Sequence, residues 1–328
     1  MNKKILHMNE PIINTYNSYG SILSMIADDE NAWLWLYNNF IQIRYVYSWN
    51  SYFFDNHHLF FDNCPYFYHY NIPKSILLSK WNGSMKDFIV DSINGGLYIY
   101  LYVDRYYISE SSSYNRASEV HEVFIYGYDI EDNSVYIADN LLDGKYIRTK
   151  VPFEEIENGY FNIKYKVDFF LNLHLFKKSE GAIVNFDFEQ VVSSINNYLY
   201  SKKTIDVSFS EKCIFGLDAV ERIVDILDNV SVQEDMYLDI RALHLFYEHK
   251  LLMKLRLEYM VNKGFLVNGE KFIEAYSSLN KNYGTIRNLA LKYNITKMNN
   301  ILLRISELLK DQIATEKMVL NELLDRFS

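Results

Sequence analysis

One histidine and one aspartate stand where a pair of strands would bring them together. The run from Glu119 to Asn140, EVHEVFIYGYDIEDNSVYIADN, predicts two strands joined by a polar turn at 131–134. His121 opens the first strand and Asp139 closes the second, so a hairpin would place both at its open end. A carboxylate there would fix the tautomer of the imidazole and stabilise its charged form, as a general base requires. The alternative is an ordinary hairpin with a polar pair at its end.

A serine near the N-terminus is the matching candidate for a nucleophile. Ile22, Met25 and Ile26 have helical spacing, and Ser18 precedes them as an N-cap or first-turn residue. The positive end of a helix dipole stabilises an anion, which would help a nucleophile in this position. A serine that only caps the helix is the structural alternative.

The intervening chain supplies the elements that would position these residues. Residues 97–104 have the continuous apolar character of a buried central strand. The polar loop after it, ISESSSYNRASE, is placed to contact a substrate or to cover the site. The other predicted elements of this part are an amphipathic helix at 85–95, strands at 146–151 and 164–171, and a short helix at 152–160.

Helical periodicity replaces this pattern from about residue 180. The sequence therefore predicts two domains, an α+β domain at 1–180 and a mostly α-helical region at 181–328. The last helix carries an apolar stripe, which predicts packing on a neighbouring helix or on a second subunit in a homodimer. The predicted helices are 186–200, 217–227, 238–261, 272–293 with a break at Gly284, and 298–327.

Composition excludes several classes of function. The chain has 328 residues and a net charge of −9, which argues against a nucleic-acid binder and gives no attraction to an anionic membrane. We find no apolar run long enough for a membrane span and no signal peptide. The only cysteines, Cys64 and Cys213, suit a reducing cytoplasm and are too few for a cysteine zinc site.

Histidines in the aromatic-rich stretch at 30–80 raise the alternative of a metal cluster. His57, His58 and His69 stand near Asp55 and Asp62, but no pair of them has the spacing of ligands on a helix. Cys64 precedes a proline rather than a helix start, so it resembles a small buried residue more than a nucleophile. We therefore expect no bound metal.

Three sequence blocks together resemble a known family. They are GLYIYLYVDRYY at 96–107, HEVFIYGYD at 121–129 and VYIAD at 135–139, with FGLDAV at 215–220 opening the helical region. They resemble the butirosin biosynthesis protein H family, whose fold is that of papain-like cysteine peptidases of the C39-like class. The resemblance implies an α+β papain-like domain with a central antiparallel sheet, followed by an α-helical C-terminal region.

The resemblance also implies an activity and a set of site residues. In this family a cysteine, a histidine and an aspartate transfer an acyl group from a carrier-protein thioester to an amine. The matching positions here are Ser18, His121 and Asp139, with Asn14 as a stand-in for the oxyanion donor. The residues expected to contact the substrate are Asp104, Tyr107 and Tyr19.

This implied activity needs partners that the resemblance also supplies. The donor would be the phosphopantetheine arm of an acyl or peptidyl carrier protein, with no cofactor bound to the chain itself, and the acceptor a small amine of natural-product biosynthesis. Because carrier proteins are acidic and so is this chain, docking would need a basic patch, for which Lys250, Lys254 and Arg256 are candidates. A solvated helix face is the other interpretation of these three residues.

Serine at the nucleophile position departs from the family pattern. A thiol ionises far more readily than a hydroxyl, so Ser18 would be a poor substitute in an unchanged site. Either serine replaces a cysteine here, as in variants made to trap substrates, or the chain is a natural homologue that lost the cysteine and works by binding. A C39-like peptidase and a catalytically inactive scaffold are therefore the alternatives to an amide-forming acyltransferase.

Overall fold

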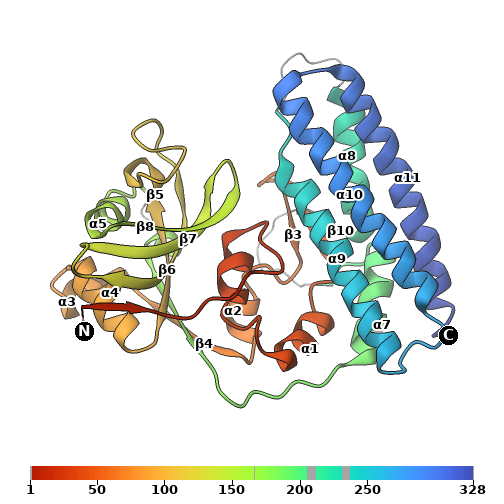
Figure 1. The fold of residues 1–328 in the computed structure, drawn as a ribbon. Helices are drawn as coiled ribbons and strands as arrows, with labels where there is room; N and C mark the ends of the chain where they lie inside the picture. Colours follow the sequence, from red (N-terminus) through yellow and green to blue (C-terminus); the bar gives the residue numbers. More distant parts are fainter. Residues whose placement is uncertain (1, 166, 205–211, 231–236, 328) are drawn as a thin grey trace. The chain divides into compact units, whose positions relative to one another are not determined.

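The computed structural model describes residues 2–165, 167–204, 212–230 and 237–327, and the chain divides into two compact units (Figure 1). The first unit comprises Met1–Ala32 and His58–Ile183, and the second comprises Trp33–His57 and Val184–Ser328. Helix α1 (Glu30–Asn38) carries the chain from one to the other. The α+β class, with an antiparallel sheet and a helical C-terminal region, agrees with the prediction from sequence.

One segment belongs to a different unit from the one the sequence suggested. Residues 33–57 fall inside the predicted domain 1–180, but the structure groups them with the helical unit. The reason is strand pairing, because β2 (Ile43–Val46) and β3 (Ser51–Phe54) form a three-stranded antiparallel sheet with β10 (Cys213–Phe215). Backbone hydrogen bonds to a strand more than 150 positions away leave no local sequence signal.

The described part of the first unit is built around a seven-stranded sheet in the order β4-β9-β5-β6-β7-β8, with β1 paired to the far end of β6. The strand pairs are antiparallel. Its strands are β1 (Lys3–Ile5), β4 (Phe67–Ile72), β5 (Tyr98–Asp104), β6 (Val120–Asp129), β7 (Ser134–Leu142), β8 (Lys145–Pro152) and β9 (Leu173–Lys178). The predicted hairpin and central strand are thus β6–β7 and β5.

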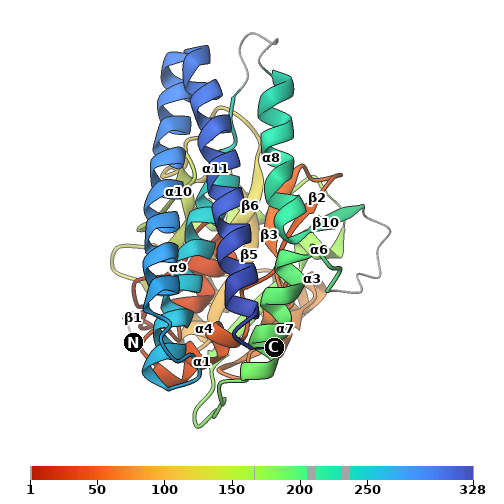
Figure 2. The same ribbon diagram turned by 90° about the vertical axis from the view of Figure 1, so that its right-hand side faces the viewer.

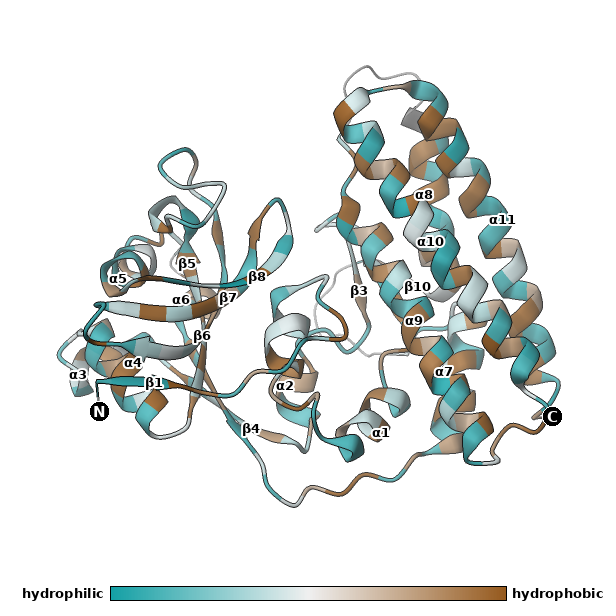
Figure 3. Cartoon of the chain, viewed as in Figure 1, coloured by the Kyte–Doolittle hydropathy of each residue, from teal (hydrophilic) through white to brown (hydrophobic). Residues whose placement is uncertain are grey.

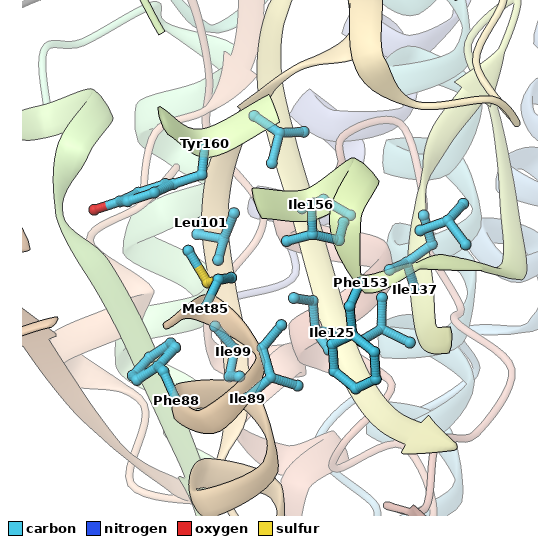
Figure 4. Packing of buried hydrophobic residues seen from close by; sticks show 14 of the residues in the cluster. Met85, Phe88, Ile89, Ile99, Leu101, Ile125, Ile137, Phe153, Ile156 and Tyr160 are labelled. Carbon is cyan, nitrogen blue, oxygen red and sulfur yellow. The ribbon is translucent and has the colours of Figure 1, made fainter. Parts of the chain in front are cut away.

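One face of this sheet is aliphatic and carries two helices. Alternate residues of β5 and β6 pack there against α4 (Met85–Asn94) and α5 (Phe153–Phe161), as Figure 4 shows. Ser84 caps α4 by accepting a hydrogen bond from the backbone N–H of Asp87, and the helix ends at Gly95 as predicted. Burial of this cluster stabilises the packing of the sheet on both helices and fixes the register of β5 and β6.

The opposite face is aromatic. Tyr100 lies edge-on to Phe61 and to His174, with ring centroids 5.4 and 6.0 Å away. Phe61 belongs to the short helix α2 (Phe60–Asn63), which follows η1 (Ser18–Ile22) in the first unit. Tyr100 of β5 therefore faces the side of the sheet on which α2 lies.

The predicted strand at 164–171 is wrong. Asp168–Leu171 form a short helix, α6, and the strand begins two residues later as β9. The side chain of Phe169 is half exposed, so the aromatic residues that suggested a buried strand are not buried in one. The segment LHLFKK, which pairs with β4 and β5, is the strand instead.

The second unit is a set of long helices, of which Figure 2 shows α8, α10 and α11 side by side. Each predicted helix of this region exists, although the bounds shift by a few residues, and α10 runs through Gly284 without the predicted break. The apolar stripe of α11 packs against other helices of the same chain. The helices are α7 (Phe188–Leu199), α8 (Gly216–Val230), α9 (Ile240–Asn262), α10 (Glu270–Thr296) and α11 (Asn299–Leu324).

Along α9, α10 and α11, polar and apolar stretches alternate, as the colouring in Figure 3 shows. None of the helices in the described ranges combines the length and the apolar character needed to cross a membrane.

The predicted basic patch does not exist as a surface. Lys250 and Arg256 are fully buried in the helical unit. Lys250 Nζ lies 2.6 Å from the carboxylate of Glu316, which is also fully buried, and the guanidinium of Arg256 donates to the carbonyl oxygens of Tyr37 and Asn39. These cations are used inside the helical unit, so they are not available to dock an acidic partner.

Removing one member of the buried pair should destabilise the helical unit strongly. Because Lys250→Met leaves the Glu316 carboxylate buried without its partner, we expect a loss of about 3–5 kcal/mol in the free energy of unfolding. Urea denaturation followed by circular dichroism measures this loss. Lys254→Met is the matched control, since it breaks a half-exposed pair with Glu258 on the same helix and should cost less than about 1 kcal/mol. Equal losses for the two variants would contradict the prediction.

Candidate active site

The hairpin β6–β7 brings His121 and Asp139 together at its open end. In the sheet His121 pairs with Val103 of β5, and Asp139 pairs with Ile147 of β8. Nδ1 of His121 lies 3.3 Å from Oδ1 of Asp139. The two side chains therefore meet across the hairpin, where the sequence pattern placed them.

Asp139 is a buried carboxylate held by several donors. Arg105 approaches Oδ2 with Nη2 at 2.6 Å and Nε at 3.1 Å, and the backbone N–H of Asn140 donates to Oδ1 at 2.6 Å. Burial by itself would raise the pKa of this carboxyl, but His121 and Arg105 outweigh burial and hold the pKa below its usual value. Asp139 is therefore ionised at neutral pH and has a fixed orientation.

His121 has two carboxylates beside it. Nδ1 lies 3.0 Å from Oε2 of Glu122, in addition to its contact with Asp139. Burial opposes the charged imidazole, but Glu122 and Asp139 outweigh burial and raise the pKa of His121 to about 9. At neutral pH the side chain is therefore an imidazolium, which stabilises an anion well and accepts a proton poorly.

The segment that carries Ser18 lies against the same end of the hairpin. The side-chain amide of Asn17 donates to the backbone oxygen of Glu122 at 3.0 Å. The side-chain amide of Asn140 donates to the backbone oxygen of Asn14 at 3.0 Å. These two bonds tie residues 14–17 to the residues that directly follow His121 and Asp139 in the sequence, so the segment that precedes Ser18 lies at the hairpin end that carries the predicted base.

The helix at Ser18 differs from the prediction. It is a short π-helix, η1, with Asn17 at the N-cap position and Ser18 as its first residue, so Ser18 has the predicted first-turn position and not that of the N-cap. Met25 and Ile26 lie beyond it in turns, although both are buried. Ser18 is fully buried, and its hydroxyl makes no hydrogen bond to any of the residues that the structure describes. Ser18 is therefore not a capping serine, and the fold of the described residues does not use its hydroxyl as a donor or an acceptor.

A tyrosine of β8 closes against this helix. A Cβ on Gly20 would lie 2.8 Å from the ring of Tyr146, so a larger residue cannot replace this glycine without moving the ring. The hydroxyl of Tyr146 also lies 3.1 Å from Ser21 Oγ, and Ser21 in turn donates to Asn17. The helix is thus packed against both β7 and β8.

Two of the proposed contact residues have other roles. Tyr19 is fully buried, edge-on to Tyr16 and tilted against Phe60, so it exposes no surface to a substrate. Asp104 is also buried and accepts hydrogen bonds from the backbone N–H groups of Tyr106 and Glu119. Packing in the first case and backbone capping in the second account for these residues without a substrate.

The loop after β5 is ordered by the same aspartate. Asp104 also accepts a hydrogen bond from Ser118 Oγ at 2.6 Å, which pins the end of the loop to its beginning. Tyr107 is half buried in the turn η2 (Arg105–Tyr107), beside Tyr106. Its contact with a substrate remains a prediction, as does the role of Asn14, whose backbone oxygen is occupied by Asn140.

Sequence reasoning missed Arg105 and Glu122. Arg105 directly follows the buried strand, and Glu122 directly follows His121. A charged residue at the end of a buried strand was the available signal for Arg105, since burial of a cation requires a partner. Neighbouring residues of a strand point to opposite faces of the sheet, so the contact of Glu122 with the imidazole of His121 could not be expected from spacing.

Two of the remaining histidines bind each other. His69 Nδ1 lies 2.7 Å from Asp62 and its Nε2 lies 2.8 Å from Nδ1 of His174, so the two rings bind each other. Over the described ranges, no group of three or more histidine, cysteine, aspartate or glutamate side chains is placed to hold a metal ion. Burial raises the pKa of the Cys64 thiol to about 12, which makes it unreactive.

No protein-family model matches the chain, and no curated protein is significantly similar to it in sequence.

Replacing Glu122 by glutamine should lower the pKa of His121 from about 9 toward its ordinary value of 6.5, because a neighbouring negative charge is lost. The stabilisation that His121 provides to the fold is fully present below about pH 6.5 and is lost as the pH rises through about 9. The variant should therefore lose less stability over that range than the parent. NMR titration of the imidazole and urea denaturation at several pH values measure both effects.

Glu119→Gln is the matched control for this prediction. Glu119 lies 3.4 Å from Arg105, and among the described residues it forms no ion pair with His121, so its loss should leave the pKa of the imidazole nearly unchanged. An unchanged pKa in Glu122→Gln, or an equal change in both variants, would contradict the assignment of Glu122 as a partner of the imidazole.

Proposed function

We propose that the first unit has a papain-like fold and transfers acyl groups, with position 18 as the nucleophile. His121 moves the proton, and Asp139 orients the imidazole. The observation that supports this best is the pair of hydrogen bonds that joins Asn17 to Glu122 and Asn140 to Asn14. They link a helix start near the N-terminus to a histidine–aspartate hairpin about a hundred residues later, as this chemistry requires.

The reaction would proceed in two steps. The side chain at position 18 attacks the carbonyl carbon of a thioester, and the donor thiol leaves with a proton from His121. An amine then attacks the acyl group held at position 18, and the side chain leaves as the amide forms. The imidazole takes the proton of the amine in this second step and returns it to the leaving side chain.

The proposed donor is the phosphopantetheine arm of an acyl or peptidyl carrier protein, and the acceptor is a small amine. Ser18 is as fully buried as Tyr19, so a substrate reaches position 18 only when the residues that cover it move. A site that closed again over the acyl group would exclude water and favour an amine over hydrolysis. With water as the acceptor, the same residues would make a peptidase.

The charge state of the site suits a thiol better than a hydroxyl. An imidazolium next to a thiol stabilises the thiolate, so a raised pKa at His121 would assist a cysteine at position 18. A serine needs a neutral imidazole to remove its proton, and the two carboxylates at His121 oppose this. We infer that position 18 belongs to a cysteine site in which Ser18 stands in place of the nucleophile.

The same observation supports a second candidate, a binding protein. With Ser18 in place, the segment that is hydrogen-bonded to the hairpin carries a buried hydroxyl without a partner among the described residues, and the hairpin carries a charged imidazole. Such a site would hold an acyl thioester or its product without reacting.

Ser18→Cys tests the proposal directly. We expect the new thiol to be alkylated by iodoacetamide with an apparent pKa well below about 8.5, because the imidazolium stabilises its thiolate. We also expect a covalent acyl adduct with an acyl thioester of N-acetylcysteamine, detected by mass spectrometry, and amide product when an amine is added. Both reactions should fall at least about 100-fold on adding His121→Gln.

The control for this experiment is Ser24→Cys, which puts a thiol at another buried position of the same segment. Both variants are made with Cys213→Ala, so that the half-exposed natural thiol does not contribute. Adduct at position 18 followed by free acid supports the peptidase. Tight thioester binding without an adduct in Ser18→Cys would contradict acyl transfer and leave the binding protein.

A further inference from the structure

Arg105 is a charged residue at this site that neither the sequence pattern nor the proposed chemistry requires. It begins the turn η2 directly after β5, and its backbone N–H donates to the carbonyl oxygen of Glu119 at 2.8 Å. Its side chain is only 6% exposed. Burial of a guanidinium costs free energy, and this one is buried against the hairpin end that carries His121 and Asp139.

The guanidinium contacts three residues of that end and one residue of the loop. Nε and Nη2 both bind Oδ2 of Asp139, and Nη2 also donates to the backbone oxygen of Asn140 at 3.1 Å. Nη2 lies 2.7 Å from Nδ1 of His121. Nη1 lies 3.4 Å from Glu119, whose other oxygen accepts from Ser113 Oγ at 2.5 Å.

The contact with His121 has a chemical consequence. A guanidinium has only donors, so Nδ1 can bind Arg105 only when that nitrogen carries no proton. The carboxylates of Asp139 and Glu122 have only acceptors, so they bind Nδ1 only when it is protonated. Three charged groups therefore compete for one ring nitrogen, and two of them require the opposite protonation from the third.

We propose that Arg105 is a positioning residue that fixes the Asp139 carboxylate and competes with it for Nδ1 of His121, thereby setting which ring nitrogen carries the proton in the neutral imidazole. When His121 is neutral, Nδ1 accepts from Arg105 and the proton is on Nε2. When His121 is charged, its Nδ1–H turns to Asp139 and Glu122.

For the proposed acyl transfer this arrangement would prevent the neutral imidazole from acting as a base. A triad histidine faces its nucleophile with Nε2. If His121 faces position 18 in the same way, a neutral ring with its proton on Nε2 has no free nitrogen there to accept the proton of the nucleophile. The charged imidazole stays competent to support a thiolate and to protonate a leaving group. This meaning for catalysis rests on the proposed function, whereas the placement of the proton does not.

The proton placement can be measured without any substrate. In protein labelled with ¹⁵N at histidine, the shifts of the two ring nitrogens report which one is protonated and the pH at which the ring titrates. At a pH above the titration of His121 in the unmodified chain, we expect protonated Nε2 and unprotonated Nδ1. A neutral ring with its proton on Nδ1 would overturn the proposal, and this measurement depends on no variant.

Arg105→Gln should then reverse the preference. Without the guanidinium, the neutral ring should carry its proton on Nδ1, bound to Asp139. The midpoint of the titration should rise by about one pH unit, a tenfold increase in proton affinity, because a nearby positive charge is lost. Arg105→Lys keeps the charge but not the two-pronged contact, so it should restore much of the midpoint.

Arg116→Gln is the matched control, because it removes an exposed arginine from the same loop and should change neither the midpoint nor the ring shifts. An Arg105→Gln variant that folds, judged by its thermal unfolding, and keeps the original shifts overturns the proposal. Failure of Ser18→Cys to form an acyl adduct would refute acyl transfer and leave this result standing. The converse also holds, so the two failures are distinguishable.

Discussion

The Asp139 carboxylate is the group around which the first unit is arranged. An ionised carboxylate without access to water is costly, and its cost is met by Arg105, His121 and the backbone N–H of Asn140. Each of these partners is held by another element. Arg105 is positioned by the end of β5, His121 by β6, and Asn140 by its bond to Asn14. The buried charge thus joins the sheet, the loop after β5 and the N-terminal segment into one site.

The two faces of the sheet have different roles in the first unit. The aliphatic face packs on α4 and α5 and supplies the burial that stabilises the sheet. The aromatic face carries the tyrosines of β5 and lies with α2. His121 and Asp139 stand at the end of the sheet, where strands stop and side chains from both faces can approach. Glu122 reaches the imidazole there, although the strand alternation directs it to the other face.

The helical unit shows how the same residue types serve structure alone. Lys250, Glu316 and three tyrosines share a buried network in which each charge has a partner of opposite sign or a hydroxyl. Tyr198 donates to the same carboxylate at 3.4 Å, and the ammonium of Lys250 lies 5.0 Å from the ring centre of Tyr283. Such a network fixes which faces of α7, α9, α10 and α11 meet, since any other register would leave a charge buried without a partner.

The sequence by itself determined the local elements and one long-range pair. The hairpin, the buried strand β5, helix α4 and the helical C-terminal region follow from periodicity, turn residues and caps, which act over a few positions. The contact between His121 and Asp139 could also be predicted, because a hairpin joins two strands that are adjacent in the sequence. Only the tertiary structure decided that residues 33–57 join the helical unit, that Lys250 and Arg256 are buried, and that Arg105 and Glu122 compete for the imidazole. The first two depend on groups far apart in the chain, and the third depends on the directions that side chains take at the end of a strand. Burial and pairing of these kinds leave no periodic trace in the sequence.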